Sequence, residues 1–346
     1  MDIGVYLCQH TLITQVSNLS NAKRYYRLQD LLDSSHQFKI AIFDPVDYPT
    51  EQERYNDLIQ TALNYCDRVI LFVTEMHEET VQLLTTLNNP KLIRISAGII
   101  NDCHSYHWFK WIYHSSIVYQ QHPHILEQLT PYTPKPYVFD VLLGNEKPHR
   151  SLINNYIIDN GYHNQVIMSY FKDPENIKNN FNWIMEPGVQ WIENSTFYGV
   201  ATNVRYHGEL ILLAQVVPLS IYNQTAYSIV TETFYDCNYS LFTEKIVKPI
   251  LSERLFLVYA PQYYLRNLRS IGFKTFDGII NESYDLEPDL IKRGNMITSQ
   301  MKFLFEQPQQ QILDKIQSIT KHNKQLILST DWNREIKTIL QSLHIQ

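Results

Sequence analysis

The sequence has few cysteines and glycines and lacks long apolar runs. Its four cysteines, Cys8, Cys66, Cys103 and Cys237, show no CxxC pair and no metal-ligand spacing, which excludes a disulfide scaffold or a zinc finger. Ten glycines and 15 prolines exclude collagen-like and linker-like chains. The longest apolar runs, such as 211–214 and 255–260, are far shorter than a membrane span, and no secretory signal pattern opens the chain. We therefore expect a cytoplasmic protein without a transmembrane segment.

Several catalytic motifs are also missing. The sequence contains no GxSxG, GxxxxGK[ST], GxGxxG or HExxH, which argues against α/β-hydrolase, P-loop, dinucleotide-dependent oxidoreductase and zincin functions. The net charge is −6 and the isoelectric point is near 6.1, so a dedicated nucleic-acid binder is not expected. With 44% hydrophobic and 18% charged residues, the 346-residue chain is globular and long enough for two domains.

The first third of the chain alternates strand-like and helix-like segments. Between the strand-like runs lie intervals with apolar residues at helical spacing, at 21–32, 51–65 and 78–87. Strand and helix repeated in this way predict a parallel sheet with right-handed crossovers. The expected strands are Ile3–Cys8, Phe38–Phe43, Arg68–Val73 and Lys91–Ser96.

A proline-rich stretch at 130–136 cannot continue a helix and predicts a domain boundary. A second series follows, with strands at 137–143, 166–170, 226–230 and 255–259 and helices at 148–158, 243–253 and 263–271. Region 173–208 is loop-rich, and further helices are expected at 286–306, 309–323 and 332–343. The prediction is an α/β protein of two Rossmann-like domains, 1–133 and 134–346, facing a cleft, with a helical C-terminus. Its last helix could pack back on the first domain. Ligands of such folds bind beyond the carboxyl ends of the strands.

The most informative segment follows the strand at 226–230. The strand ends at Glu232, and a loop leads to Thr243, an N-cap candidate, with Glu244 in the first helical turn. The positive charge of Lys245 is unfavourable near the positive end of the helix dipole. A bound anion that contacts both the ammonium and the free N–H groups would offset this cost. Lys248 lies one turn later on the same face. The alternative is a capped, solvated turn with ordinary surface lysines.

These residues carry a resemblance to a known family. The segment 242–250 (FTEKIVKPI), followed by an apolar strand, resembles the donor-binding segment of GT-B glycosyltransferases of the fucosyltransferase type. The chain also resembles glycosyltransferase-like proteins of phages and marine bacteria in Pro148-His149-Arg150, in 272–276 (GFKTF) and in 282–285 (ESYD). The resemblance covers about residues 137–290. Lys248-Pro249 replaces the Arg-Asn pair of fucosyltransferases, so the transferred sugar stays open.

The resemblance implies a role for each matching residue. Lys245 would contact the donor diphosphate, and Arg150 would be a second phosphate ligand. Glu244 or Glu232 would accept hydrogen bonds from a sugar or ribose hydroxyl. No Asp-x-Asp stands in a suitable metal-binding loop, so fixed cations rather than a metal would neutralise the leaving nucleotide.

An inverting transferase also needs a base near the acceptor hydroxyl, expected in loops that follow the first domain's strands. Asp102 and His104 are our preferred pair, because one loop combines a base with a carboxylate. The simpler interpretation of every candidate base is a solvated loop residue. Tyr284 and Asp285 could line the donor pocket, or Asp285 could cap a helix beginning at Leu286. The aromatic run 107–119 could be an acceptor platform or a helix packing on the first sheet. The remaining base candidates are His10, Asp44, Glu75 and His77.

The sequence thus predicts a metal-independent glycosyltransferase whose partners are a nucleotide-sugar and a glycan acceptor. It predicts no nucleic acid as partner and no cofactor beyond the nucleotide-sugar co-substrate. The alternative is a non-catalytic nucleotide-sugar-binding or carbohydrate-binding protein of the same fold. Donor sugar, acceptor, stereochemical outcome and oligomeric state stay open.

Overall fold

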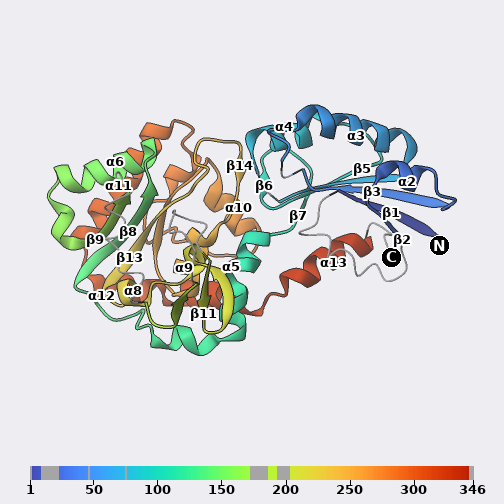
Figure 1. Ribbon diagram of the computed structural model, residues 1–346. Helices are drawn as coiled ribbons and strands as arrows, with labels where there is room; N and C mark the ends of the chain where they lie inside the picture. Colours follow the sequence, from blue (N-terminus) through green and yellow to red (C-terminus); the bar gives the residue numbers. More distant parts are fainter. Residues whose placement is uncertain are drawn as a thin grey trace. The chain divides into compact units, whose positions relative to one another are not determined.

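The computed structural model describes residues 2–8, 23–45, 47–74, 76–171, 186–192 and 203–342 (Figure 1). The chain forms two compact units. Unit 1 comprises Met1–Tyr113 and Asp331–Gln346, and unit 2 comprises His114–Thr330. Each unit has its own parallel sheet. The prediction of a mixed α/β protein with parallel sheets is therefore confirmed.

Unit 1 is built on a six-stranded sheet in the order β2-β1-β3-β4-β5-β7, with every neighbouring pair parallel. Helices α2 (Leu28–Leu32), α3 (Gln52–Tyr65) and α4 (Glu78–Thr86) lie between successive strands in the sequence. The four strands expected in this region are present, because short β-branched runs separated by amphipathic helices bury both faces of a parallel sheet. The strands are β1 (Ile3–Cys8), β2 (Lys23–Tyr25), β3 (Phe38–Phe43), β4 (Arg68–Val73), β5 (Leu92–Ser96) and β7 (Tyr106–His107); β6 is Ile99–Ile100.

The core of unit 1 follows from the alternation of side chains along its strands. One sheet face gathers buried aliphatic residues around Trp108, whose ring lies 5.1 Å from that of Phe72. The C-terminal helix α13 (Trp332–Ser342) belongs to this unit, and the Trp332 ring lies 5.9 Å from Phe109 at 78°. Edge-to-face packing of this kind anchors the start of the last helix. The aliphatic members of the core are Ile3, Val5, Leu7, Ile40, Ile42, Ile70 and Ile95.

Unit 2 contains a four-stranded parallel sheet in the order β15-β13-β8-β9. The strands are β8 (Tyr137–Asn145), β9 (Val166–Phe171), β13 (Thr225–Thr231) and β15 (Phe256–Tyr259). The principal helices are α6 (Pro148–Asp159), α9 (Glu244–Leu251), α10 (Tyr264–Ser270), α11 (Leu290–Glu306) and α12 (Gln309–Ser329). Shorter elements are α8 (Leu219–Tyr222), β14 (Tyr239–Ser240), η1 (Pro123–Gln128), η2 (Tyr162–Gln165), η6 (Leu213–Gln215) and η7 (Ser283–Leu286).

The two faces of this sheet differ in chemistry. Helices α6 and α11 pack together on one face (Figure 1), where the Phe139 ring lies 5.1 Å from Phe305 of α11. Neighbouring residues of a strand point to opposite faces, so Asp140 and Ser228 face the other side, where α9 packs on β13. The second face is thus partly polar beneath α9.

Three predictions about secondary structure were incomplete or wrong. Residues 23–25, expected in a helix, form strand β2, because pairing with β1 outweighs their local helical spacing. The loop-rich region contains β10 (Val189–Trp191) and β11 (Asn203–Tyr206), which form an antiparallel meander with β12 (Glu209–Leu212) directly after it. The helix expected from Leu286 begins at Leu290, and Asp289 is its N-cap.

The division between the units also differs from the boundary expected at residue 133. The aromatic helix is α5 (Lys110–Gln121), and its residues from His114 onward belong to unit 2 rather than to the first sheet. The buried Tyr119 hydroxyl donates to the Gln215 carbonyl at 3.1 Å and accepts from the Val217 N–H at 2.6 Å. Gln120 donates to the carbonyls of Ile327 and Thr330. These distant partners tie the helix to unit 2 and could not be identified from its own sequence.

A buried ion pair joins the strands of unit 2. The Arg254 guanidinium donates to Asp140 at 2.8 Å, and both side chains are only 3% exposed. Arg254 also donates to Ser228 and to three backbone carbonyls, those of Tyr222, Thr225 and Tyr227. Burial raises the pKa of Asp140, and the charge of Arg254 opposes this shift. The pair is stable only as a complete hydrogen-bonded set.

We expect Arg254→Met to destabilise the protein by about 3–5 kcal/mol, because it leaves the Asp140 carboxylate buried without its partner. The free energy of unfolding in urea measures the effect. Arg205→Met is the matched control, since Arg205 is exposed, and it should change stability by less than about 0.5 kcal/mol. Equal stabilities of the two variants would contradict a structural role for the pair.

Candidate functional site

The candidate site lies at the carboxyl ends of β13 and β8, within unit 2. Glu232, directly after β13, is buried, and its carboxylate accepts from Thr243 at 2.8 Å and from Tyr264 at 2.7 Å. Thr243 is the N-cap of α9 and accepts from the Lys245 N–H at 3.3 Å. The end of the strand therefore positions the start of the helix.

Two lysines and a carboxylate line one small cavity beneath α9. Lys245, Lys248 and Asp140 contribute to its wall together with residues of β13, and its volume is about 40 Å³. This is room for about three water-sized spheres, enough for a small anion but not for a nucleotide. Lys245, whose side chain is 24% exposed, also pairs with Glu244 at 2.6 Å. The expected placement of Lys245 and Lys248 on one side of the helix is thus present.

A second group of cations surrounds the same strand end. Lys147, the N-cap residue of α6, donates to the Thr233 carbonyl at 2.7 Å. Arg150 is buried and donates to Asn145 O at 2.8 Å and Thr231 O at 3.4 Å. Gly144 has φ of +64°, a left-handed conformation that accompanies the register shift at the end of β8. This irregular strand end presents the Asn145 carbonyl to Arg150.

His149 joins the two groups. Its Nε2 lies 3.0 Å from the Glu232 carbonyl, and its ring stacks on Tyr235 with 3.9 Å between centroids. Burial, followed by the charge of Arg150, lowers the pKa of His149 to about 3. The neutral ring therefore donates from Nε2 to the carbonyl and supports the strand end rather than adding a charge.

The pKa shifts at the site reflect burial and the crowding of cations. Burial, together with the charges of Arg150 and Lys245, lowers the pKa of Lys147. Burial lowers the pKa of Lys248 to about 8, against the attraction of Glu244. Burial raises the pKa of Glu244, but Lys245 and Lys248 outweigh burial and lower it overall. Additional negative charge would stabilise such a group of cations.

This arrangement can bind an anion by several means at once. The N-termini of α6 and α9 follow the neighbouring strands β8 and β13, and each carries basic residues in its cap or first turns. Backbone N–H groups and helix dipoles favour an anion at such ends, and ammonium groups add charge-assisted hydrogen bonds. The chemistry that fits is a phosphate or another small oxyanion.

Two predicted ligands have structural partners instead. Both oxygens of Glu232 accept hydrogen bonds within the protein, so its observed contacts position Thr243 and Tyr264. Arg150 contacts backbone carbonyls of the strand ends, and its guanidinium adds positive charge beside them. The structure brings together six predicted residues of unit 2: Arg150, Glu232, Thr243, Glu244, Lys245 and Lys248.

The predicted base pair belongs to unit 1. Asp102, with φ of +59°, and His104 are both exposed and lie in the loop between β6 and β7. No hydrogen bond joins these two described side chains. Asp44 accepts from Thr74 at 3.0 Å across the ends of β3 and β4, and His77 is the N-cap residue of α4. His10 and Glu75 lie outside the described residues.

The segments 272–276 and 282–285, which carry part of the family resemblance, are joined by hydrogen bonds. Glu282 accepts from the Phe276 N–H at 2.6 Å, from Thr275 at 2.7 Å and from Arg269 at 3.0 Å. Asp285 accepts from two backbone N–H groups at the start of α10, at 2.7 and 2.9 Å. Of the two roles considered for Asp285, the contacts support capping, but the capped helix is α10 and not one that begins at Leu286. Its partners precede it by 20 and 19 residues in the sequence, beyond the reach of a local motif.

Sequence reasoning missed Lys147 and Asp140 at this site. Lys147 offered a signal, since a lysine directly before a helix that opens with proline opposes the helix dipole, as Lys245 does. Asp140 lies in the middle of an apolar strand. A carboxylate at such a position is expected to be buried and therefore to need a partner. Its partner Arg254 lies 114 residues away, so only the fold reveals the contact.

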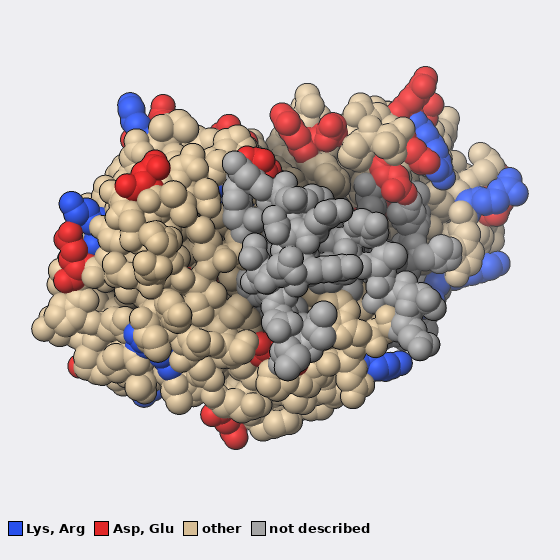
Figure 2. All heavy atoms as spheres, turned by 60° about the vertical axis from the view of Figure 1, so that its left-hand side comes forward, with Lys and Arg blue, Asp and Glu red and all other residues tan. Residues whose placement is uncertain are grey.

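The described parts of the chain limit other types of site. Among them, no three His, Cys, Asp or Glu side chains are placed to hold a metal ion, and no helix is long and apolar enough to cross a membrane. On the face shown in Figure 2, the described Lys and Arg side chains are interspersed with Asp and Glu. The cations of the site described above form a local cluster within unit 2.

Thr243→Ala should destabilise the protein by about 1 kcal/mol, because α9 loses its cap and Glu232 loses a donor. Thr243→Ser, which keeps the hydroxyl, is the matched control and should retain most of the stability. Urea unfolding of both variants gives the comparison. A serine variant as unstable as the alanine variant would show that the methyl group, and not the cap, matters.

No family model matches the chain, and no curated protein has significant sequence similarity to it. The functional conclusion therefore rests on the residues at the carboxyl ends of β8 and β13.

Proposed function

We propose that the protein is a glycosyltransferase that moves a sugar from a nucleotide-diphosphate donor to a hydroxyl of a glycan, without a metal ion. In this proposal the two α/β units are the halves of a GT-B-type enzyme located in the cytoplasm. Unit 2 binds the donor and unit 1 the acceptor. The observation that carries the proposal is the cluster of Lys147, Arg150 and Lys245 around the end of β13.

The chemistry of the reaction explains why such a cluster would be useful. When the glycosidic bond to the donor breaks, negative charge develops on the departing diphosphate. Positive groups held in place before the reaction stabilise this charge without reorganisation. Lys245 is bound to Glu244 at 2.6 Å and partly exposed, so a phosphate oxygen would compete with Glu244 for the ammonium. Glu244, once released, could accept a hydrogen bond from a donor hydroxyl.

The acceptor side of the proposal depends on unit 1. Asp102 and His104 remain our candidates for the base that removes the acceptor proton. Their role is a hypothesis drawn from their position in a loop after β6.

A non-catalytic nucleotide-sugar-binding protein is the second candidate, favoured by one observation. Neither Asp102 nor His104 is held by a hydrogen bond to the other, whereas bases in active sites are commonly oriented by a partner. The two functions differ in what happens to a bound donor. A transferase slowly passes sugar to water, and a binding protein leaves the donor intact.

The test combines binding and turnover. Thermal unfolding of the full chain with GDP, UDP, dTDP and CMP identifies the nucleotide, since a ligand that binds the folded state raises the melting temperature. The corresponding nucleotide-sugar is then incubated with the protein and free sugar is measured over hours. Stabilisation with sugar release supports a transferase, and stabilisation without release supports a binding protein. No stabilisation by any diphosphate would contradict both.

Lys245→Ala should weaken binding of the stabilising nucleoside diphosphate by about 1.5–3 kcal/mol, the loss expected for one charge-assisted hydrogen bond. Isothermal titration calorimetry measures the affinity. Lys292→Ala is the control, because Lys292 is an exposed lysine of α11, and it should bind as the wild type does. Unchanged affinity of Lys245→Ala would contradict the proposed phosphate contact.

Lys248 predicts a pH dependence for the same binding. Its pKa of about 8 means that the ammonium is charged at pH 7 and mostly neutral at pH 9. The attraction for a phosphate therefore falls as the pH rises through about 8, and affinity should drop roughly tenfold over this interval. Lys248→Met should bind more weakly at pH 7 and lose most of this dependence.

The Lys245→Ala variant controls for other titrations, since it keeps Lys248 and should retain the drop. Affinities measured by calorimetry at pH 7, 8 and 9 separate the variants. A wild-type affinity that stays constant across this range would exclude Lys248 from the binding site.

A further inference from the structure

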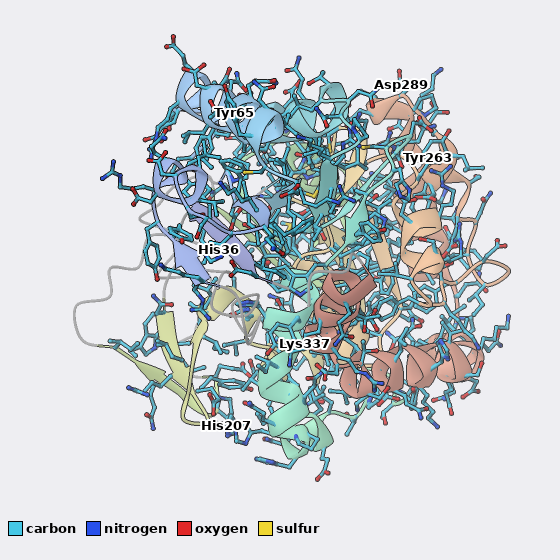
Figure 3. All side chains as sticks on the ribbon, turned by 90° about the vertical axis from the view of Figure 1, so that its right-hand side faces the viewer. His36, Tyr65, His207, Tyr263, Asp289 and Lys337 are labelled. Atoms are coloured by element: carbon cyan, nitrogen blue, oxygen red, sulfur yellow. The ribbon has the colours of Figure 1, made fainter. Side chains whose placement is uncertain are left out.

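A groove lies between two helices of unit 1. Its volume is about 780 Å³, compared with about 40 Å³ for the cavity beneath α9, and this is within the usual range for pockets that bind small molecules. Helices α2 and α3, which pack against each other, form its walls; in Figure 3, His36 follows α2 and Tyr65 ends α3. The groove can therefore hold a ligand much larger than a small anion.

The groove lies where the strand order of unit 1 changes direction. The chain passes from β1 to β2 on one side of β1 and then continues with β3, β4 and β5 on the other side. Tyr6 of β1 lines the groove together with the start of α2, which follows β2, and the first turns of α3, which follows β3. Parallel α/β sheets bind ligands beyond the carboxyl ends of their strands, at such a change of direction.

The lining combines aromatic rings with polar side chains. Tyr6 is only 5% exposed and belongs to the buried part of the groove, whereas Tyr26 is 66% exposed. A tyrosine ring offers an apolar face and a polar tip. A sugar ring presents the matching groups, since one face carries C–H bonds and its edges carry hydroxyls. An exposed tyrosine beside polar side chains therefore suits a carbohydrate.

The charges along the groove cancel. Arg27 forms an exposed pair with Asp30 at 3.8 Å, and pairs of this kind are weak. Guanidinium and carboxylate groups can each bond to two neighbouring hydroxyls. In contrast to the cations around β13, this lining favours a neutral ligand rich in hydroxyls over a phosphate. The charged residues of the lining are two arginines and two acids, Arg27, Arg54, Glu53 and Asp57.

We propose that the groove between α2 and α3 binds a neutral oligosaccharide, with Tyr26 stacking on a sugar ring and Arg27 and Asp57 bonding to its hydroxyls. The choice of a glycan rests on the proposed function, which assigns the acceptor to unit 1. The loop of Asp102 and His104 precedes β7, four strand spacings or about 19 Å from β1. The groove thus holds a part of the glycan remote from these base candidates, so the ligand is an extended chain of sugars.

The test measures glycan binding by the full chain without any nucleotide. An array of neutral and acidic glycans identifies the ligand, and calorimetry with the free oligosaccharide gives its affinity. We expect binding of a neutral oligosaccharide without competition by nucleoside diphosphates, because the proposed donor site belongs to unit 2. Binding of acidic glycans only, competition by a nucleoside diphosphate, or no binding to the array would overturn the proposal.

Two tyrosine variants locate the site. Tyr26→Ala should weaken oligosaccharide binding about tenfold or more, since an aromatic ring covered by a ligand is commonly a major contributor to its affinity. Tyr65→Ala is the matched control, because Tyr65 is 69% exposed and is not among the described residues that line the groove. It should bind as the wild type does. Melting temperatures confirm that both variants are folded, and equal affinities of the two variants would overturn the assignment.

The outcomes separate this inference from the proposed function. Glycan binding that depends on Tyr26, without stabilisation by any nucleoside diphosphate, would support the groove and contradict the donor site. Stabilisation by a nucleotide, together with glycan binding that is insensitive to Tyr26→Ala, would overturn the groove alone.

Discussion

The buried carboxylate of Glu232 is the interaction on which the candidate site depends. It accepts from Thr243 and Tyr264, and its backbone carbonyl accepts from His149. Through these contacts one residue fixes the start of α9, the start of α10 and the ring at the beginning of α6. Burial raises the pKa of Glu232, and the nearby charge of Lys245 opposes this shift. The carboxylate therefore needs both its hydroxyl donors and its cationic neighbours.

A second constraint is the number of charges that unit 2 buries. Asp140, Arg150, Glu232, Glu244, Lys248 and Arg254 are all less than 10% exposed. Each would be costly alone, and the structure offsets the cost with pairs and with backbone carbonyls at strand ends. Asp140 and Arg254 complete one another, whereas the lysines and Arg150 are concentrated at the carboxyl end of β13. The first arrangement supports the sheet, and the second leaves positive potential where ligands of parallel α/β sheets bind.

Local sequence predicted most elements of the fold because both sheets are parallel and buried. Val69–Val73 of β4 and Phe256–Tyr259 of β15 are continuous apolar runs, and helices such as α3 carry apolar residues at helical spacing. The failures have different causes. Lys23–Tyr25 is too short and polar to show a strand pattern, and it forms one by pairing with β1. The meander depends on pairing between short segments, which single-strand patterns do not specify.

The sequence by itself determined the parallel α/β class, the order of its elements and the cap at Thr243, because each depends on residues close together along the chain. It also identified the lysines of α9 as unusual for a helix start. Tertiary structure alone decided that Lys147 joins them, that Arg254 neutralises Asp140 and that α5 packs with unit 2. These outcomes depend on contacts between residues 80 to more than 200 positions apart, and no local pattern encodes which distant partners will meet.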